Sequence, residues 1–226
     1  MNKIKVLELF AGSRSVGKIA DKLGMDVFSV DWNEYKDIDL SKDIEDLKMK
    51  DVPFIPDMVW ASPDCNTYSI ASIKTHRDGT TPRSDYAKKC DNVNRHFIHL
   101  IDKWLKINPD MVFFIENPRG MLRKMPFMQK FKRYTVWYCQ YGDSRAKPTD
   151  IWTNSTTWVP RPPCHNGNPE CHHERAPRGS KTGTQGRKGS YDRSIIPKQL
   201  CLEVLRSVKK NNISFFTRVL RILKIK

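Results

Sequence analysis

Four short apolar segments, each followed by a polar turn, constrain most strongly what this chain can fold into. They are residues 3–10, 25–32, 57–62 and 111–118. Apolar residues at helical spacing lie between them, in 16–23 before Gly24 and in 91–106. Strands that alternate with helices predict an α/β fold built on a doubly wound, mostly parallel sheet.

The pattern changes towards the end of the chain. Residues 134–142 and 150–154 predict a further pair of strands, and residues 159–193 are then dense in Pro, Gly, Lys, Arg, Cys and His. Helical spacing returns in 195–208, before a basic amphipathic segment at 213–226. We therefore expect three parts. They are a main domain at 1–158, a short irregular basic insertion at 159–193, and a helical segment at 194–226 that returns to the main domain.

The charge balance points to a polyanionic partner. The 226 residues include 40 Lys and Arg against 25 Asp and Glu, a net charge of +15 that would attract nucleic acid. A merely soluble basic surface is the alternative. No run of about 18 apolar residues predicts a membrane span, and the first residues lack the layout of a signal peptide. We expect a cytoplasmic protein whose six cysteines are thiols or metal ligands rather than disulfides.

Unusual residues lie at the carboxyl ends of the predicted strands, the edge where open α/β sheets bind ligands. They are Phe10-Ala11-Gly12, Asp31-Trp32, the stretch from Ser62 to Ser69, and Glu116-Asn117-Pro118. A tight turn that opens a helix supplies backbone N–H groups, an acid after the second strand suits a ribose diol, and Trp32 could stack on an adenine. The turn lacks G-x-G-x-x-G spacing, and there is no G-K-[ST]. These residues indicate a nucleoside-containing cofactor without the fingerprint of a dinucleotide or a phosphate loop.

Several stretches, in the family's order, resemble motifs of the DNA (cytosine-5)-methyltransferases, which use S-adenosylmethionine. LELFAGSRSVG, SVDWNE and KDIEDL resemble the three motifs around the cofactor, CNTYS the run that begins at the nucleophile, and FFIENPRGML the Glu-Asn-Val motif. DRSIIPKQLCLEVL resembles the final motif, which returns to the cofactor pocket. The resemblance implies a Rossmann-like methyltransferase fold. It also implies the cofactor-binding residues, which are Phe10, Ala11, Gly12, Ser13, Asp31, Trp32, Asp43, Ile44, Ser62, Pro63 and Ser194.

The same resemblance implies that Cys65 is the nucleophile and Glu116 the acid that binds the target base. A cytosine ring is a poor carbon nucleophile, and a thiolate added at carbon 6 makes it an enamine whose carbon 5 can take a methyl group. Glu116 would stabilise the charge that develops at nitrogen 3. Cys65 needs a lowered pKa or a cationic neighbour to attack at neutral pH. Arg145 and Lys147 are the candidates for that cation and for a substrate phosphate contact.

Plainer interpretations exist for these residues. An intracellular cysteine such as Cys65 is often an inert small hydrophobe. An acid at a strand end, such as Asp31 or Glu116, often caps the segment that follows. The remaining cysteines outside the insertion are most simply core thiols, and they are Cys90, Cys139 and Cys201.

Asp64 departs from the family's pattern, which has a proline directly before the nucleophile. A carboxylate beside Cys65 would raise the pKa of the thiol if both faced one site. Three explanations are open. Asp64 points away, toward a backbone N–H or a cation, and shapes the loop; or it accepts a hydrogen bond from a substrate amino group; or methylation has been lost.

Two other motifs are degraded, and one region is short. Only Arg145, Lys147 and Thr149 correspond to the family's two-arginine motif, and Asp192-Arg193-Ser194 replaces Gly-Asn-Ser. Residues 159–193 take the place of the family's target-recognition domain. With so few residues to read bases, we expect a short recognition sequence or little sequence preference.

The insertion resembles a small zinc knuckle. Its thiols and imidazoles are Cys164, His165, Cys171, His172 and His173. A polar segment without a core gains most from a structural metal ion. Loop histidines that merely touch DNA are the alternative. The basic residues interleaved with glycine would suit phosphate contacts, and they are Arg175, Arg178, Lys181, Arg187 and Lys188.

Together these features predict a compact DNA cytosine-5 methyltransferase of the kind that phages and viruses encode. It would act as a monomer, in the host cell if viral, on double-stranded DNA whose target base is flipped out of the helix. One alternative is a DNA-binding relative without catalysis. Another is a methyltransferase that acts on RNA or on a modified pyrimidine.

Overall fold

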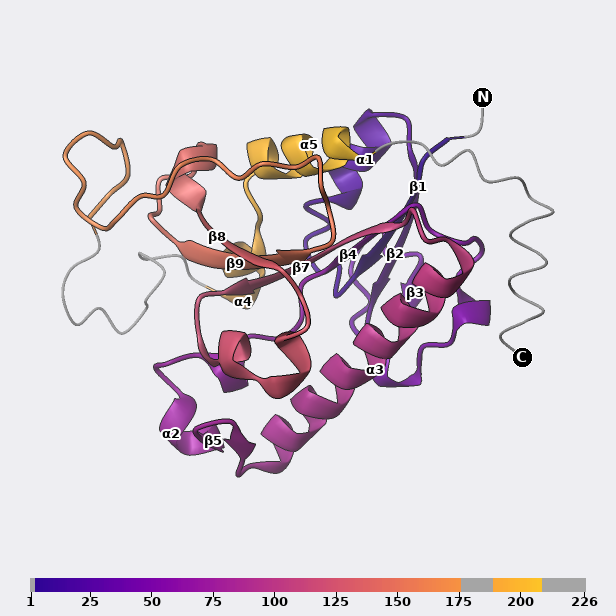
Figure 1. Ribbon diagram of the computed structural model, residues 1–226, viewed down its shortest axis with the longest axis horizontal. Helices are drawn as coiled ribbons and strands as arrows, with labels where there is room; N and C mark the ends of the chain where they lie inside the picture. The colour runs from indigo at the N-terminus through magenta and orange to yellow at the C-terminus, as the bar shows by residue number, and fades with distance from the viewer. Residues whose placement is uncertain (1–2, 176–188, 209–226) are drawn as a thin grey trace.

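The computed structural model describes residues 3–175 and 189–208, and a seven-stranded sheet forms its centre (Figure 1). The strands are β1 (Lys5–Leu9), β2 (Asp26–Asp31), β3 (Leu40–Ser41), β4 (Met58–Ala61), β7 (Val112–Pro118), β8 (Arg133–Trp137) and β9 (Pro148–Thr153). Their order across the sheet is β3-β2-β1-β4-β7-β9-β8. The first five strands in this order pair in parallel, whereas β9 pairs antiparallel with both β7 and β8.

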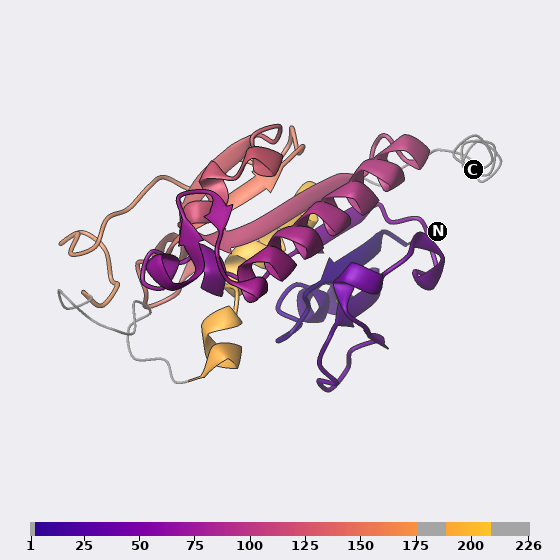
Figure 2. The same ribbon diagram turned by 90° about the horizontal axis from the view of Figure 1, so that it is seen from below.

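A long helix, α3 (Asp85–Ile107), covers one face of the sheet. Figure 2 shows it running across the length of the molecule. Its buried side chains include Phe97 and Trp104, which share a core cluster with Leu7 and Ile115 of the central strands. Because alternate residues of a strand face opposite sides, Leu7 turns toward α3 while its neighbours in β1 turn away.

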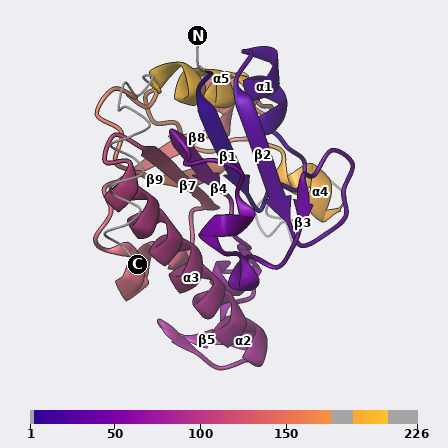
Figure 3. The same cartoon turned by 90° about the vertical axis from the view of Figure 1, so that its right-hand side faces the viewer.

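Two shorter helices cover the opposite face. They are α1 (Gly17–Lys22) and α5 (Lys198–Ser207), which lie together above the sheet in Figures 1 and 3. Leu200 of α5 shares a second core cluster with Trp60 and Phe114. The sheet is therefore covered on both faces, which confirms the predicted doubly wound α/β fold.

The remaining elements are short. They are the 3-10 helices η1 (Ile44–Asp46), η2 (Met49–Asp51), η3 (Asn66–Tyr68), η4 (Met121–Lys124), η5 (Pro126–Met128) and η6 (Tyr138–Tyr141), the helices α2 (Ile73–His76) and α4 (Ser190–Ser194), and the two-stranded ribbon of β5 (Arg77–Asp78) and β6 (Thr81–Pro82). Apolar periodicity did not predict them, because segments of two to five residues are too short to show a period.

The strand order reverses at β1, and this reversal positions the site. From β1 the chain builds outward through β2 and β3, and then crosses back to β4 and β7 on the other side of β1. The carboxyl ends of β1 and β4 therefore lie next to each other at a topological switch point, where open α/β sheets bind ligands. The turn that begins at Phe10 and the loop that contains Cys65 leave the sheet there.

Two predicted boundaries differ from the structure for local reasons. The helix predicted from residue 91 begins at Asp85, because the Ser84 hydroxyl accepts the Ala87 N–H at 3.1 Å and caps it. The strand predicted over 134–142 ends at Trp137, where the chain turns into η6. Residues 159–175 contain no regular strand or helix, while 176–188 and the tail 213–226 lie outside the described residues.

None of the helices in the described ranges has the length and apolar character needed to cross a bilayer.

A buried ion pair holds the segment after Cys65. The Arg77 guanidinium, from β5, bonds the Asp91 carboxylate of α3 at 2.6 Å, and the Arg77 side chain is fully buried. The Tyr68 hydroxyl also donates to Asp91, at 2.6 Å, and accepts from Asn94 Nδ2 at 2.7 Å. These bonds connect η3, β5 and α3 through buried groups. The position of the loop that carries Cys65 therefore depends on this pair.

We expect Arg77→Met to lower the free energy of unfolding by about 3–5 kcal/mol, because it leaves the Asp91 charge buried without its partner. Arg83→Met is the matched control. It removes a surface ion pair with Asp78, whose side chains are 60% and 72% exposed, and should cost less than about 1 kcal/mol. Urea denaturation of both variants measures the difference. Equal effects would show that the Arg77 pair contributes no more than a surface contact.

Candidate active site

A cavity of about 300 Å³ opens at the switch point. Its lining includes five residues predicted to bind a cofactor, which are Phe10, Trp32, Asp43, Ile44 and Pro63. They come from the ends of β1, β2 and β4 and from η1, so the fold brings together segments that are far apart in the sequence. The Trp32 side chain is 71% exposed. A volume of this size lies at the small end of the range for small-molecule sites.

The predicted residues Gly12, Asp31 and Ser194 meet beside this cavity. The Asp31 carboxylate accepts the Gly12 N–H and the Asn33 N–H, both at 2.9 Å. Gly12 has a φ of +43°, and a Cβ at this position would lie 3.9 Å from both Asp31 Oδ2 and Ser194 Oγ. Glycine therefore suits the left-handed turn and leaves the space between the two side chains open.

Three other predicted cofactor residues bond to the protein and do not line the cavity. Ser13 Oγ lies 2.8 Å from Ser15 Oγ, and Ser62 Oγ accepts the Trp60 indole N–H at 2.8 Å. Ala11 is buried. In these positions the three residues support the turns after β1 and β4, which carry the lining residues.

Cys65 lies in the loop after β4, and its side chain is partly exposed. The neighbouring Asp64 carboxylate accepts the Asn66 backbone N–H at 2.6 Å and the Tyr86 hydroxyl at 2.6 Å. Asp64 thus bonds to a backbone N–H, as one of the three explanations from sequence expected. Because Tyr86 belongs to α3, the bond also fastens the cysteine loop to that helix.

Glu116 and Asn117, at the end of β7, lie beside the same loop. Asn117 Nδ2 donates to the Pro63 carbonyl at 2.8 Å, and the Tyr138 hydroxyl donates to Glu116 Oε1 at 2.8 Å. Glu116 is 6% exposed and Tyr138 is fully buried. The protein therefore fixes the orientation of the carboxylate before any ligand binds.

Lys147 lies close enough to Glu116 and Cys65 to interact with both electrostatically. Its Nζ lies 4.7 Å from the centre of the Tyr138 ring. Burial lowers the pKa of Lys147, while the charge of Glu116 opposes that effect. Lys147 therefore faces both the thiol and the carboxylate.

Arg145 occupies a different place from the one expected of a phosphate contact. Its side chain is buried, with Nε donating to Asp143 Oδ1 at 2.8 Å. The Arg145 guanidinium carbon lies 5.7 Å from the centre of the Tyr138 ring. Its position supports Tyr138 and the chain around Asp143.

The environment holds the Cys65 thiol in its neutral form. Burial raises the pKa of Cys65 to about 11, the Lys147 ammonium lowers it, and the charges of Asp64 and Glu116 raise it further. In the folded protein, the charge of the neighbouring Asp64 therefore makes the Cys65 thiolate harder to form. Lys147 opposes it.

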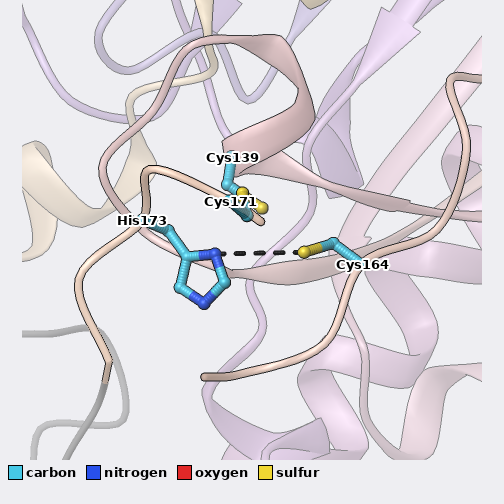
Figure 4. A group of neighbouring side chains, drawn as sticks. All are labelled: Cys139, Cys164, Cys171 and His173. Atoms are coloured by element: carbon cyan, nitrogen blue, oxygen red, sulfur yellow. Dashed lines mark hydrogen bonds between the residues drawn. The ribbon is translucent and has the colours of Figure 1, made fainter. Parts of the chain in front are cut away.

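A second group of side chains lies away from this cavity, around η6. Cys139, Cys164, Cys171 and His173 have ligand atoms within 4.8 Å of one another (Figure 4). Three of them were predicted as ligands from the insertion, whereas Cys139 was expected to be a core thiol.

Two predicted ligands, His165 and His172, lie outside this group. His165 is exposed. His172 directs Nε2 toward the Asp143 carbonyl at 3.1 Å. His172 and His173 are consecutive in a non-helical segment, so their side chains point in different directions.

The strand order, with the single antiparallel strand β9 between β7 and β8, matches the Rossmann-like fold of methyltransferases. No protein-family model matches the chain. A curated relative, the probable DNA (cytosine-5)-methyltransferase of Frog virus 3 (isolate Goorha), is 29% identical over 224 residues, which are 89% of this chain and 99% of the relative. This relative confirms the resemblance to the DNA (cytosine-5)-methyltransferases that the motifs indicated.

Solved structures of methyltransferases are also similar. A triple mutant of Spodoptera frugiperda DNMT2 matches 69% of this chain and 51% of its own, at 17% identity and a TM-score of 0.48. The Entamoeba histolytica methyltransferase EhMeth matches 78% of this chain and 58% of its own, at 13% identity and a TM-score of 0.49. The chain spans about half the length of these structures.

Two tyrosines of the site were not identified from sequence. Tyr138 bonds Glu116 and Tyr86 bonds Asp64, in each case across more than twenty positions. Tyr138 lies two positions before QYGDSRAKPT, the stretch that contains the remains of the two-arginine motif, and this stretch was the nearest signal. Tyr86 precedes the predicted start of its helix and gave no signal.

We expect Cys65 to react with iodoacetamide faster as pH rises toward 11, because alkylation requires the thiolate. Lys147→Met should slow the reaction several-fold at pH 8.5, and Asp64→Asn should speed it, because the first removes a charge that lowers the pKa and the second one that raises it. Mass spectrometry of the peptide that contains Cys65 gives the rates.

Lys88→Met and Asp85→Asn are the charge-matched controls, since this pair lies on the surface with side chains 58% and 97% exposed. Both controls should leave the rate near that of the wild type. If Lys147→Met also left it unchanged, Lys147 would have no influence on the thiol.

Proposed function

We propose that the chain transfers a methyl group from S-adenosylmethionine to carbon 5 of a cytosine in DNA, through a transient covalent bond to Cys65. The observation that carries this proposal is the placement of Cys65, Glu116 and Lys147 together beside a cavity lined by Trp32. A thiol, a fixed carboxylate and a cation beside a nucleoside-sized cavity match the needs of this reaction.

The cavity fits the cofactor's chemistry. Trp32 offers an exposed ring on which adenine can stack, and Asp31 offers carboxylate oxygens at the carboxyl end of β2, the position that suits a ribose diol. Ile44 provides apolar lining and Asp43 a carboxylate in the same cavity. When bound, S-adenosylmethionine supplies an electrophilic methyl group. The residues of the chain would bind the base, hold it in place and activate it.

Cys65 and Glu116 would act on the target base. The Cys65 thiolate adds to carbon 6, and the displaced electron pair makes carbon 5 the nucleophile that takes the methyl group. Loss of the proton from carbon 5 and departure of the Cys65 sulfur then restore the aromatic ring. Glu116, held by Tyr138, would bond the ring at nitrogen 3 and the exocyclic amine.

Lys147 would offset the cost that burial imposes on Cys65. Its ammonium lowers the pKa of the thiol in the free protein. A substrate that neutralises Glu116 by sharing a proton with it would also remove one of the charges that raise that pKa. We infer that Cys65 becomes reactive when the base is bound.

DNA as the substrate is supported by the net charge of +15 and by the name of the viral relative. A base inside a duplex cannot reach Cys65, so it must leave the stack, at a cost of a few kcal/mol. We propose that the chain acts as a monomer on double-stranded DNA. The basic insertion, 159–193, would contact its phosphates.

A non-catalytic DNA-binding relative is the second candidate. The pKa of about 11 for Cys65 favours it, because few thiols are ionised at neutral pH in the free protein. RNA is a further candidate substrate, which the same assay tests beside DNA.

We expect S-adenosylhomocysteine to protect Trp32 from quenching by acrylamide, since the other tryptophans are less exposed. Trp32→Ala should weaken cofactor binding by about 5- to 150-fold, the value of stacking one base on an aromatic ring. Trp32→Phe should weaken it less. Fluorescence titration and calorimetry provide the measurements, and unchanged affinity in Trp32→Ala would place the adenine elsewhere.

We expect tritium to pass from labelled S-adenosylmethionine to DNA, with no detectable transfer by Cys65→Ser. Tyr138→Phe should retain the thiol but lower the rate about 10- to 100-fold, because it removes one hydrogen bond to a charged group. Bisulfite sequencing of the product identifies the base and its context. Transfer to tRNA alone would replace DNA with RNA as substrate.

Covalent trapping on DNA with 5-fluorocytosine separates catalysis from mere binding. The wild type should form a stable adduct, because the fluorine cannot leave as the proton does, and Cys65→Ser should form none. Asp64→Pro restores the residue usual in the family and tests whether Asp64 limits the rate. A wild type that binds this DNA without trapping would identify the non-catalytic relative.

A further inference from the structure

The group around η6 combines three thiols with one imidazole. Cys139 belongs to η6, and Cys164, Cys171 and His173 belong to the insertion (Figure 4). Cys139, Cys164 and His173 are buried, with exposed fractions of 2%, 6% and 8%, and Cys171 is partly exposed. All three cysteines are free thiols. Four ligand side chains, three of them buried, meet at one point from two segments 25 positions apart in the sequence, and this arrangement needs a physical cause.

The donor set and its size match zinc. Structural zinc sites are tetrahedral and use Cys3His sets, with the sulfur atoms about 2.3 Å from the ion and therefore about 3.8 Å from one another. Here the four ligand atoms lie within 4.8 Å of one another, and Cys164 Sγ lies 3.9 Å from His173 Nδ1. Closure by less than about 1 Å would complete the tetrahedron.

Neighbouring N–H groups are directed at the sulfur atoms. Asn168 Nδ2 donates to Cys164 Sγ at 3.5 Å, and Gln140 Nε2 donates to Cys171 Sγ at 3.8 Å. Thiolates that bind a metal accept such bonds, which reduce their negative charge and fix their orientation.

One contact must change when a metal binds. The Gly167 N–H donates to His173 Nε2 at 3.1 Å, so Nδ1 carries the proton of the neutral ring and faces Cys164. A metal at Nδ1 would leave the proton on Nε2, and the Gly167 amide would have to turn away. Gly167 has a φ of +78° and no Cβ, so its peptide can rotate at low cost.

We propose that Cys139, Cys164, Cys171 and His173 bind one structural zinc ion, which fastens residues 164–173 of the insertion to η6. Residues 159–175 form no strand or helix, and their apolar cluster contains little beyond these cysteines, Ala146 and Trp137. A metal therefore supplies the cross-link that a hydrophobic core would supply elsewhere.

The proposed zinc site adjoins the candidate active site through the backbone. Cys139 directly follows Tyr138, whose hydroxyl holds Glu116. The insertion makes further bonds to the same stretch, since the Glu174 N–H donates to the Ser144 carbonyl at 2.9 Å. Metal binding would thus restrain the chain on both sides of Tyr138. The existence of the zinc site does not depend on the proposed methyl transfer, and its test is independent of activity.

Metal content of the purified full chain tests the proposal. We expect about one zinc per chain by mass spectrometry of the metal, and loss of most of it in Cys139→Ser and in His173→Ala. His165→Ala and His172→Ala, the neighbouring imidazoles, should retain zinc, and Cys65→Ser should retain it as a thiol outside the group. Zinc retained by Cys139→Ser, or lost only from the His165 or His172 variants, would overturn this ligand set.

Cobalt substitution tests the geometry without any variant. Wild-type protein stripped with a chelator and reloaded with Co²⁺ should show the intense visible bands of a tetrahedral site and a near-ultraviolet thiolate-to-cobalt charge-transfer band. Returning zinc should bleach both and raise the Tm of the stripped protein. A wild type that purifies without zinc and shows neither band with cobalt would refute the site even if the cysteine variants fail to fold.

Discussion

Parallel pairing of β4 with β7 is the constraint on which the candidate site depends. Ala61, the last residue of β4, pairs with Ile115, so Pro63 and Asn117, each two residues further along, lie at the same height at one edge of the sheet. Pro63 and Asn117 then meet, and the bond between them keeps the cysteine loop beside the acid strand. A slip of one residue would turn Glu116 to the other face of the sheet, because side chains alternate along a strand. The register of β4 against β7 therefore determines whether Glu116 faces the site.

The antiparallel end of the sheet completes the same edge. β9 runs against β7, so the start of β9 lies beside the end of β7 and brings Lys147 close to Glu116. β8 runs against β9 and ends where β9 begins, which places Tyr138 behind the same carboxylate. A parallel β9 would have placed Lys147 at the opposite edge, whereas β8 runs in the same direction as β7 and keeps its end at this edge. The position of Lys147 thus depends on the reversal of one strand, β9.

Sequence patterns predicted those parts of the molecule that depend on local or periodic signals. The sheet strands other than β3 and the helices on both faces follow from periodicity, Phe10 and Trp32 from their places at strand ends, and Asp43 from the family resemblance. Long-range partners gave no such signal. Cys139 looks like a core thiol until the fold brings the insertion against it, and nothing adjacent to Tyr138 indicates that it bonds an acid 22 positions earlier. Spacing within the insertion likewise could not select His173 over its neighbour, because that choice depends on the direction of one side chain.

The protonated state of Cys65 has a consequence for the lifetime of the molecule in a cell. Oxidation by peroxides proceeds through the thiolate, and a thiol held neutral by burial reacts slowly. In the proposed reaction, where Cys65 ionises only when the target base is bound, the sulfur would escape sulfenic acid formation between encounters. The charge of Asp64, which disfavours the thiolate needed for attack on a base, would then also slow oxidation of the Cys65 sulfur.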